Sequence, residues 1–155
     1  MQIREAKTDI LKALNYRLTL PSPYTFLVRF LKAVRKDKSC DIRALTTVSE
    51  YILENTLLSF HMNKEYLPSE LAAMAVLLAQ TCMELGSSSL SGPQWSETLC
   101  ITTKYSRKKV EQIAVDFIKE EDTVQDYGLK KTLKRKYKGA VTYQRLLRLA
   151  LCSLK

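Results

Sequence analysis

The side chains that could perform acid–base chemistry are few in this chain of 155 residues. His61 is the only histidine, and it stands between Phe60 and Met62 near a predicted helix end. Residues 120–122, Glu-Glu-Asp, could hold a cation, although a solvated helix end explains them more simply. Catalysis requires ionisable groups that converge and adjust one another. The sequence therefore predicts a packed or surface His61 and a chain that is not an enzyme.

Metal and cofactor chemistry have equally little support. Among the cysteines Cys40, Cys82, Cys100 and Cys152, no pair has the close spacing of a zinc knuckle. Ser106 stands in no nucleophile motif, and no glycine-rich phosphate loop occurs. We therefore expect no metal, no cofactor and no small-molecule substrate. The cysteines are predicted to be reduced thiols in a reducing compartment.

Glycine placement and apolar spacing predict an all-α fold to carry these side chains. The first 85 residues contain no glycine, the residue that supplies the positive backbone angles of tight hairpins. Apolar residues recur at steps of three and four along most of the chain, which is typical of helices. The predicted helices cover residues 2–17, 23–36, 42–63, 68–85, 95–105, 107–121 and 130–137, and a further docked helix is expected near 146–151.

One predicted helix should run through the middle of the fold. Residues 71–79 form an unbroken apolar run, which is far shorter than the ~20 residues of a membrane span. A helix that is apolar on all sides is buried in a protein core. We therefore expect no membrane insertion and a central buried helix opened by Pro68. Asp41 and Ser106 are predicted N-caps of the helices that follow them.

Charge is concentrated towards the C-terminal end. The net charge is +9, from 25 basic and 16 acidic residues, and the last acidic residue is Asp126. Residues 128–155 hold nine basic residues and no acidic one, so a basic tail follows a neutral body. Such a tail attracts phosphates or acidic partners or acts as a nuclear-import signal, but a solvated charge run explains it equally well. The tail residues of interest are Lys130, Lys131, Lys134, Arg135, Lys136 and Lys138.

Three segments carry a family resemblance. They are residues 10–27, which include ILKALNYRL and PSPYTFL, residues 67–79, LPSELAAMAVLLA, and residues 134–141, KRKYKGAV. In this order they resemble mitotic (A/B-type) cyclins. The first segment is similar to the passage from the last helix of the first cyclin box into the second box. The other two resemble the third helix of the second box and the basic segment that closes many cyclins.

The resemblance implies a fold and a division of the chain. The fold is a cyclin-like box of five helices around one central buried helix. Residues 1–20 would be the last helix of a first cyclin box with its linker, residues 21–126 the C-terminal cyclin box, and residues 127–155 a basic C-terminal tail. The helices expected from apolar spacing at residues 23–121 agree with such a box.

The resemblance also implies a function. It is that of a non-catalytic regulatory subunit that binds and activates a cyclin-dependent protein kinase, as a heterodimer, in cell-cycle control. Apolar kinase-contacting positions of the family map onto Leu11, Tyr16 and Leu18. The family commonly has glutamate where this chain has Lys7, and only the last helix of the first box is present, so we expect a partial or divergent cyclin. Core or linker packing is an equal alternative for Leu11 and Leu18.

A second class of function remains open at this point. A nucleic-acid-associated cyclin-fold transcription module would use the basic tail, in which Tyr127, Tyr137 and Tyr143 are interleaved with the cations. Binding driven by phosphates would weaken steeply with salt. The tail has no base-reading pattern, so we rank this alternative below the kinase partner. Either function places the chain in the nucleus and cytoplasm.

Overall fold

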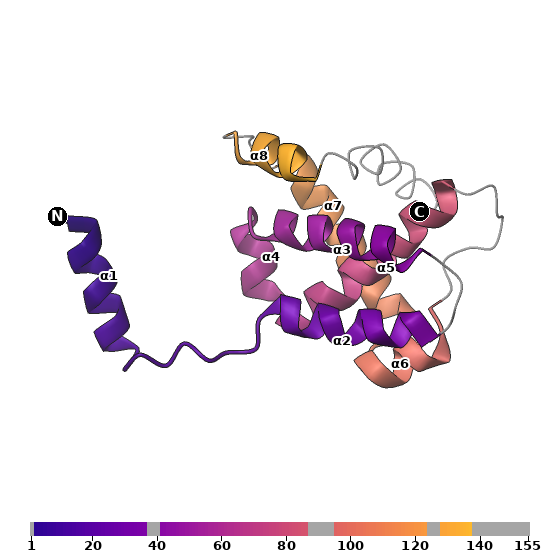
Figure 1. Ribbon diagram of the computed structural model, residues 1–155, viewed down its shortest axis with the longest axis horizontal. Helices are drawn as coiled ribbons and strands as arrows, with labels where there is room; N and C mark the ends of the chain where they lie inside the picture. Colours follow the sequence, from indigo (N-terminus) through magenta and orange to yellow (C-terminus); the bar gives the residue numbers. More distant parts are fainter. Residues whose placement is uncertain (1, 37–40, 87–94, 124–127, 138–155) are drawn as a thin grey trace.

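The protein is described by a computed structural model that covers residues 2–36, 41–86, 95–123 and 128–137. In these residues the backbone forms helices and connections without a strand, which confirms the all-α class (Figure 1). The helices are α1 (Gln2–Ala13), α2 (Pro23–Lys36), α3 (Ile42–Thr56), α4 (Phe60–Glu65), α5 (Pro68–Gly86), α6 (Glu97–Thr103), α7 (Arg107–Thr123) and α8 (Leu129–Lys136).

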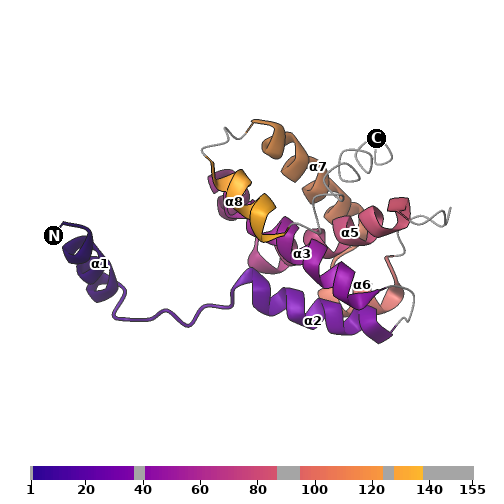
Figure 2. The same cartoon turned by 45° about the horizontal axis from the view of Figure 1, so that its top comes forward.

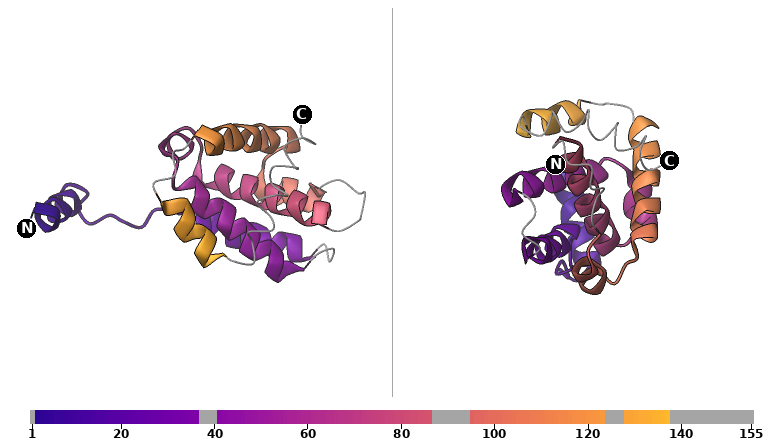
Figure 3. Two further views of the ribbon diagram at one scale, coloured as in Figure 1. Left: turned by 90° about the horizontal axis from the view of Figure 1, so that it is seen from above. Right: turned by 90° about the vertical axis from the view of Figure 1, so that its right-hand side faces the viewer.

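The centre of the fold is α5, as the apolar run predicts. Every residue from Leu71 to Ala79 is at most 1% exposed. Helices α2, α3 and α7 all pack against α5, so it is covered from several sides (Figures 1 and 3). Pro68 occupies the first helical position, where its missing N–H removes no hydrogen bond. The alanines of the run let the surrounding helices approach α5 closely.

The neighbouring helices follow their apolar stripes and predicted caps. On α2, the buried positions include Leu27, Phe30 and Val34, which face the core. The Asp41 carboxylate caps α3, since it accepts hydrogen bonds from the N–H groups of residues 43 and 44 at 2.9 and 3.4 Å. The hydroxyl of Ser106 accepts from the Lys109 N–H at 3.4 Å, as expected of a cap for α7. These caps satisfy backbone donors that the first helical turn leaves open.

The predicted helix at residues 42–63 is two helices, so that prediction is wrong. Helix α3 ends at Thr56, and α4 begins at Phe60. The hydroxyl of Ser59 accepts a hydrogen bond from the Met62 N–H at 3.1 Å and so starts a new helix. The side chain of Asn63 donates to the carbonyl oxygens of Thr56 and Ser59 at 2.6 and 2.8 Å. The apolar pattern hid this break because Met62 remains fully buried after it.

The first helix is also shorter than the predicted residues 2–17. Helix α1 ends at Ala13, and Asn15 and Tyr16 take positive φ angles of 48° and 55°. After these left-handed residues the chain continues as an extended linker. Such a linker is expected before Pro21 and Pro23, because residues that precede proline avoid the helical region. All three views place α1 apart from the other helices (Figures 1, 2 and 3).

The basic helix predicted at residues 130–137 is present as α8. It begins after Gly128, whose φ of 83° suits glycine, and it lies beside α3 (Figure 2). The predicted loop at 87–93 and the docked helix near 146–151 lie outside the described residues. The remaining predicted helices, at 68–85, 95–105 and 107–121, correspond to α5, α6 and α7 with end points shifted by one or two residues.

Candidate protein interface

The residues with a predicted kinase contact lie together on α1 and the turn that follows it. Lys7 precedes Leu11 by one helical turn, so the two side chains are neighbours on the helix surface. The Tyr16 N–H donates to the Leu11 carbonyl at 2.9 Å, and the Leu18 N–H donates to the Tyr16 carbonyl at 3.0 Å. The turn thereby gathers Leu11, Tyr16 and Leu18 into one short segment. Their role as kinase contacts stays a prediction.

This segment is open to solvent. From residue 3 to residue 22 every side chain is exposed except Leu11, which is half-buried. The apolar residues Ile3, Ile10 and Leu14 are 87%, 59% and 49% exposed. Leu18 is 62% exposed, so its side chain does not pack in the core of the described residues, and linker packing stays an alternative to a kinase contact. An apolar helix face left in water is typical of a contact surface for another macromolecule.

A groove of about 700 Å³ lies where the start of α2 meets α3 and α8. Its lining combines apolar side chains with two carboxylates and one ammonium group. The lining residues are Ser22, Pro23, Tyr24, Thr47, Glu50, Leu53, Glu54, Leu57, Lys136 and Tyr137. Sequence reasoning did not find this groove. The groove depends on α8 packing against α3, and no local sequence pattern in α3 or α8 predicts that contact.

The contact between α8 and α3 centres on one carboxylate. Glu54 accepts a hydrogen bond from the Tyr137 hydroxyl at 2.8 Å and also pairs with the Lys136 ammonium group. The Tyr137 ring meets the Tyr51 ring edge-on, with 5.7 Å between ring centroids. Burial, and then the bond to Glu54, raise the pKa of Tyr137 from 10.0 to about 12. The bond to Glu54 raises the pKa of Lys136.

The basic residues of the tail therefore divide into different environments. Lys136 faces Glu54, whereas Lys131 and Arg135 are exposed on α8. Lys130 is half-buried, and Lys134 lies on the same helix. Lys138, together with Tyr127 and Tyr143, lies outside the described residues. The boundary predicted at residue 126 between box and tail stays a prediction, although the contact with Glu54 joins α8 to the helices before it.

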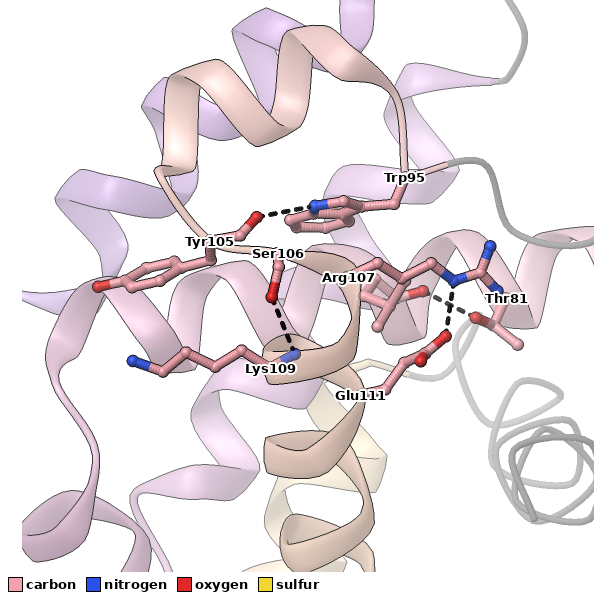
Figure 4. A network of polar contacts seen from close by, with 8 residues as sticks. Thr81, Trp95, Tyr105, Ser106, Arg107, Lys109 and Glu111 are labelled. Carbon is pink, nitrogen blue, oxygen red and sulfur yellow. Dashed lines mark hydrogen bonds and ion pairs between the residues drawn. The ribbon is translucent and has the colours of Figure 1, made fainter.

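A second polar cluster joins the segments that flank α6, and the start of α7, to the start of α5, and Figure 4 shows its bond between Trp95 and Tyr105. The indole N–H of Trp95 donates to the Tyr105 carbonyl at 3.1 Å, and the Tyr105 and Ser69 hydroxyls are 2.8 Å apart. Lys109 pairs with the buried Glu70, and this bond is the main cause that raises the pKa of Lys109. The cluster joins neighbouring helices and presents no converging reactive groups, so we interpret it as structural.

Tyr66 and Asp116 form a further link between the α4–α5 connection and α7. The Tyr66 hydroxyl donates to the Asp116 carboxylate at 2.8 Å. Burial first, and then Asp116, raise the pKa of Tyr66 to about 12. The same hydrogen bond is the main cause that lowers the pKa of Asp116. The hydrogen bond thus favours a protonated Tyr66 phenol and an ionised Asp116 carboxylate.

The residues weighed for catalysis are not brought together. His61 is exposed on α4, which confirms a surface position, and Glu120 accepts a hydrogen bond from the Ser59 hydroxyl at 2.9 Å. Burial raises the pKa of the Cys82 thiol to about 12. Within the described ranges, no group of three or more His, Cys, Asp or Glu side chains is placed to hold a metal ion. No helix in those ranges is long and apolar enough to cross a membrane.

Comparisons with known proteins show which family the helices α2 to α8 resemble. The family described as "Cyclin, C-terminal domain" matches residues 21–146, which include α2 to α8. Cyclin-B2-1 of Oryza sativa subsp. japonica is 35% identical over 119 residues, which cover 75% of this chain and 26% of that protein. Cyclin-B2-3 of Arabidopsis thaliana is 36% identical over 97 residues, which cover 63% of this chain and 20% of that protein.

A soybean relative matches over a longer stretch. The G2/mitotic-specific cyclin S13-7 of Glycine max is 31% identical over 144 residues, which cover 90% of this chain and 51% of that protein. No solved structure matches the chain. The chain thus spans 20–26% of the length of Cyclin-B2-1 and Cyclin-B2-3. The comparisons lend no support to the transcription-module alternative.

Proposed function

The chain belongs to the cyclin family through its C-terminal cyclin domain, and from this premise we propose that it is a non-catalytic regulatory subunit of a cyclin-dependent kinase in mitotic cell-cycle control. A regulatory subunit acts by binding one conformation of its partner more tightly than another. Such a subunit requires a rigid surface and no reactive groups of its own. The helices packed around the buried α5 supply that rigidity.

One observation carries the proposal. The cyclin domain match covers the packed helices α2 to α8, and directly before it one segment carries the exposed Tyr16 and Leu18 and the half-buried Leu11. A few residues carry most of the binding energy of a protein interface, and tyrosine is enriched among them. The segment is therefore available to a partner without any rearrangement of the helices behind it.

Lys7 sets the expected strength of the contact. The position commonly holds glutamate in mitotic cyclins, and a cation there repels the groups that a carboxylate attracts. We infer that this chain binds a kinase more weakly than cyclins with the glutamate do. The variant Lys7→Glu should then bind the kinase at least about tenfold more tightly, because like charges across an interface cost several kcal/mol.

The test is a titration of a purified cyclin-dependent kinase with the chain, followed by heat release and by phosphorylation of a peptide substrate. Leu11→Asp and Leu18→Asp should each weaken binding at least about tenfold, because each would bury an unpaired carboxylate in an apolar contact. Ile101→Asp on α6 is the matched control, because Ile101 is also highly exposed but lies far along the chain from α1. Equal losses in all three variants, or no complex with either wild type or Lys7→Glu, would contradict the proposal.

The basic residues of α8 support a further part of the proposal, a distribution between nucleus and cytoplasm. Lys131 and Arg135 are exposed, as a nuclear-import signal requires. A fluorescent fusion that carries Lys131→Ala and Arg135→Ala should shift towards the cytoplasm. The control is Lys64→Ala with Lys104→Ala, which removes the same charge from exposed positions outside α8. An unchanged distribution in the α8 variant would exclude this role for α8.

A further inference from the structure

The groove between α2, α3 and α8 combines apolar walls with a few charged groups. Leu53 and Tyr137 are buried in its lining, whereas Tyr24 and Leu57 are exposed along its rims. Its volume of about 700 Å³ lies within the range of about 300–1,000 Å³ that is usual for ligand sites. Apolar walls with a small number of placed polar groups are also typical of such sites. The groove therefore has the size and the lining of a binding site.

Helix α3 places two carboxylates on this groove. Glu50 and Glu54 are one helical turn apart, so their charges are neighbours and repel each other. The Lys136 ammonium group and the Tyr137 hydroxyl both donate to Oε1 of Glu54, and Oε2 accepts no hydrogen bond from the described residues. Glu50 is half-buried and makes no ion pair within the same residues. The lining thus holds two carboxylates against one cation, in a chain whose net charge is +9.

The second cation that this lining lacks is best supplied by an arginine. A guanidinium group has five N–H donors in a planar fork, so it can meet Glu50 and the free Oε2 of Glu54 together. The exposed ring of Tyr24 offers a face on which the same group can stack. Large apolar side chains beside the arginine would cover Leu57. We propose that the groove binds a segment of a partner protein in which one arginine is flanked by large apolar side chains.

The cations of α8 limit the partner to a single positive charge at this point. Lys136 lies in the lining, and Lys131 and Arg135 are exposed on the same helix. Like charges brought together across an interface cost binding energy, so these side chains repel a run of basic residues. Specific binding sites commonly combine such a repulsive element with an attractive one. The groove should therefore select one arginine between apolar residues over a polybasic segment.

Much of the groove is already held in place before a partner binds. Tyr137 is fixed by its bond to Glu54 and by the edge-on contact with the Tyr51 ring. Pro23 has a φ angle fixed by its own ring, and it starts α2 at the opposite wall. A partner therefore orders few side chains of the groove, which lowers the entropy cost of binding.

This inference goes beyond the proposed kinase partnership and does not depend on it, because no candidate kinase contact lines the groove. The experiment is a titration of the isotope-labelled chain with the peptide acetyl-Ala-Leu-Arg-Leu-Ala-amide, followed by nuclear magnetic resonance. The amide signals of α3 and α8 should shift in a saturable manner. A peptide with citrulline in place of arginine keeps the shape but loses the charge. It should bind at least about tenfold more weakly, because hydrogen bonds between ionised groups are stronger than neutral ones.

Variants of the chain identify the carboxylate and the apolar rim. Glu50→Gln should bind the arginine peptide at least about tenfold more weakly and leave the citrulline peptide nearly unaffected. Glu50→Lys should reverse the preference, so that a peptide with glutamate in place of arginine binds more tightly than the arginine peptide. Leu57→Ala should weaken binding at least about threefold through lost apolar contact. The matched controls are Glu65→Gln and Leu67→Ala, at exposed positions outside the groove, and both should bind as wild type does.

Several outcomes would overturn the proposal, provided that circular dichroism shows every variant to be folded. They are the absence of saturable binding, equal affinity for the arginine and citrulline peptides, and unchanged affinity in Glu50→Gln. Tighter peptide binding by Arg148→Gln than by wild type would identify residues 147–149, Leu-Arg-Leu, as the occupant in place of a partner. A mass that rises with concentration in sedimentation, and falls when the peptide is added, would identify a second copy of the chain. Either result would also overturn the proposal.

Discussion

The two end helices of the described chain, α1 and α8, are both short and rich in charge, yet they relate to the bundle in opposite ways. Helix α8 is fixed to α3 through Tyr137, which is 8% exposed, and through Glu54. Helix α1 carries more exposed apolar surface but meets no such anchor within the described residues. The comparison teaches that docking of a short helix depends on one buried aromatic ring with a satisfied polar group, more than on the amphipathic pattern of the helix.

The largest effect expected from this comparison is the loss of the α8 anchor. Tyr137→Ala should lower the free energy of unfolding by about 2–4 kcal/mol, because it removes a buried ring and leaves a cavity beside Tyr51. Tyr16→Ala is the matched control on the α1 side, where the ring is 63% exposed, and it should cost less than about 0.5 kcal/mol. Urea unfolding followed by circular dichroism measures both. Similar losses in the two variants would show that the two helices are anchored alike.

A smaller loss is expected from the carboxylate alone. Glu54→Ala should cost about 1–2 kcal/mol, since it leaves the Tyr137 hydroxyl without its acceptor and breaks a half-exposed ion pair. Glu50→Ala, one turn away on α3, should change stability by less than about 0.5 kcal/mol. Hydrogen exchange should show faster opening of α8 in the first variant only. Unchanged exchange in Glu54→Ala would mean that the rings of Tyr51 and Tyr137 dock α8 unaided.

High pH should weaken the same anchor. The folded-state pKa of Tyr137 is about 12, above its usual value of 10.0, so folding favours the protonated phenol. Its contribution to stability is complete below pH 10, and it is lost as the pH rises from 10 towards 12. Burial first, and then the bond to Asp116, raise the pKa of Tyr66 to about 12 as well, so its contribution to stability is lost over the same pH range. Thermal unfolding between these pH values should be less pH-dependent in Tyr137→Phe and in Tyr66→Phe than in wild type, and an identical slope in all three proteins would contradict the assignment.

The smallest effect is expected in α1. Ile10→Ser should leave the unfolding free energy of dilute protein within about 0.5 kcal/mol of wild type, because the side chain is already solvated. Ile113→Ser on α7, where the isoleucine is 2% exposed, is the matched change in the bundle and should cost several times more. Differential scanning calorimetry at low concentration distinguishes the two. A large loss from Ile10→Ser would place α1 against the bundle.

Much of the bundle could be predicted from the sequence, because its signals are local. The apolar run 71–79 marks the central helix, and Asp41 caps α3 as expected. The break between α3 and α4 was missed because Ser59 acts through a cap, while the apolar spacing continues across it to Met62. The early end of α1 was missed because two residues other than glycine take left-handed angles there.

The candidate interfaces also differ in how far the sequence predicts them. Lys7, Leu11, Tyr16 and Leu18 were found through a resemblance in a contiguous segment, and their role still awaits a binding measurement. The groove and the anchor at Glu54 were beyond sequence reasoning, because Glu54 and Tyr137 are 83 residues apart. A contact at that separation results from how the helices pack and leaves no periodic trace in either segment.

The same separation bears on how the chain emerges during synthesis. Glu54 leaves the ribosome long before Tyr137, so the helices around α5 can assemble while α8 is still being translated. The Tyr51 ring then lacks its Tyr137 neighbour until α8 is made, so a nascent chain halted before that point would expose to chaperones an aromatic side chain that Tyr137 later contacts. Docking of α8 on α3 thus ends the exposure of the Tyr51 ring.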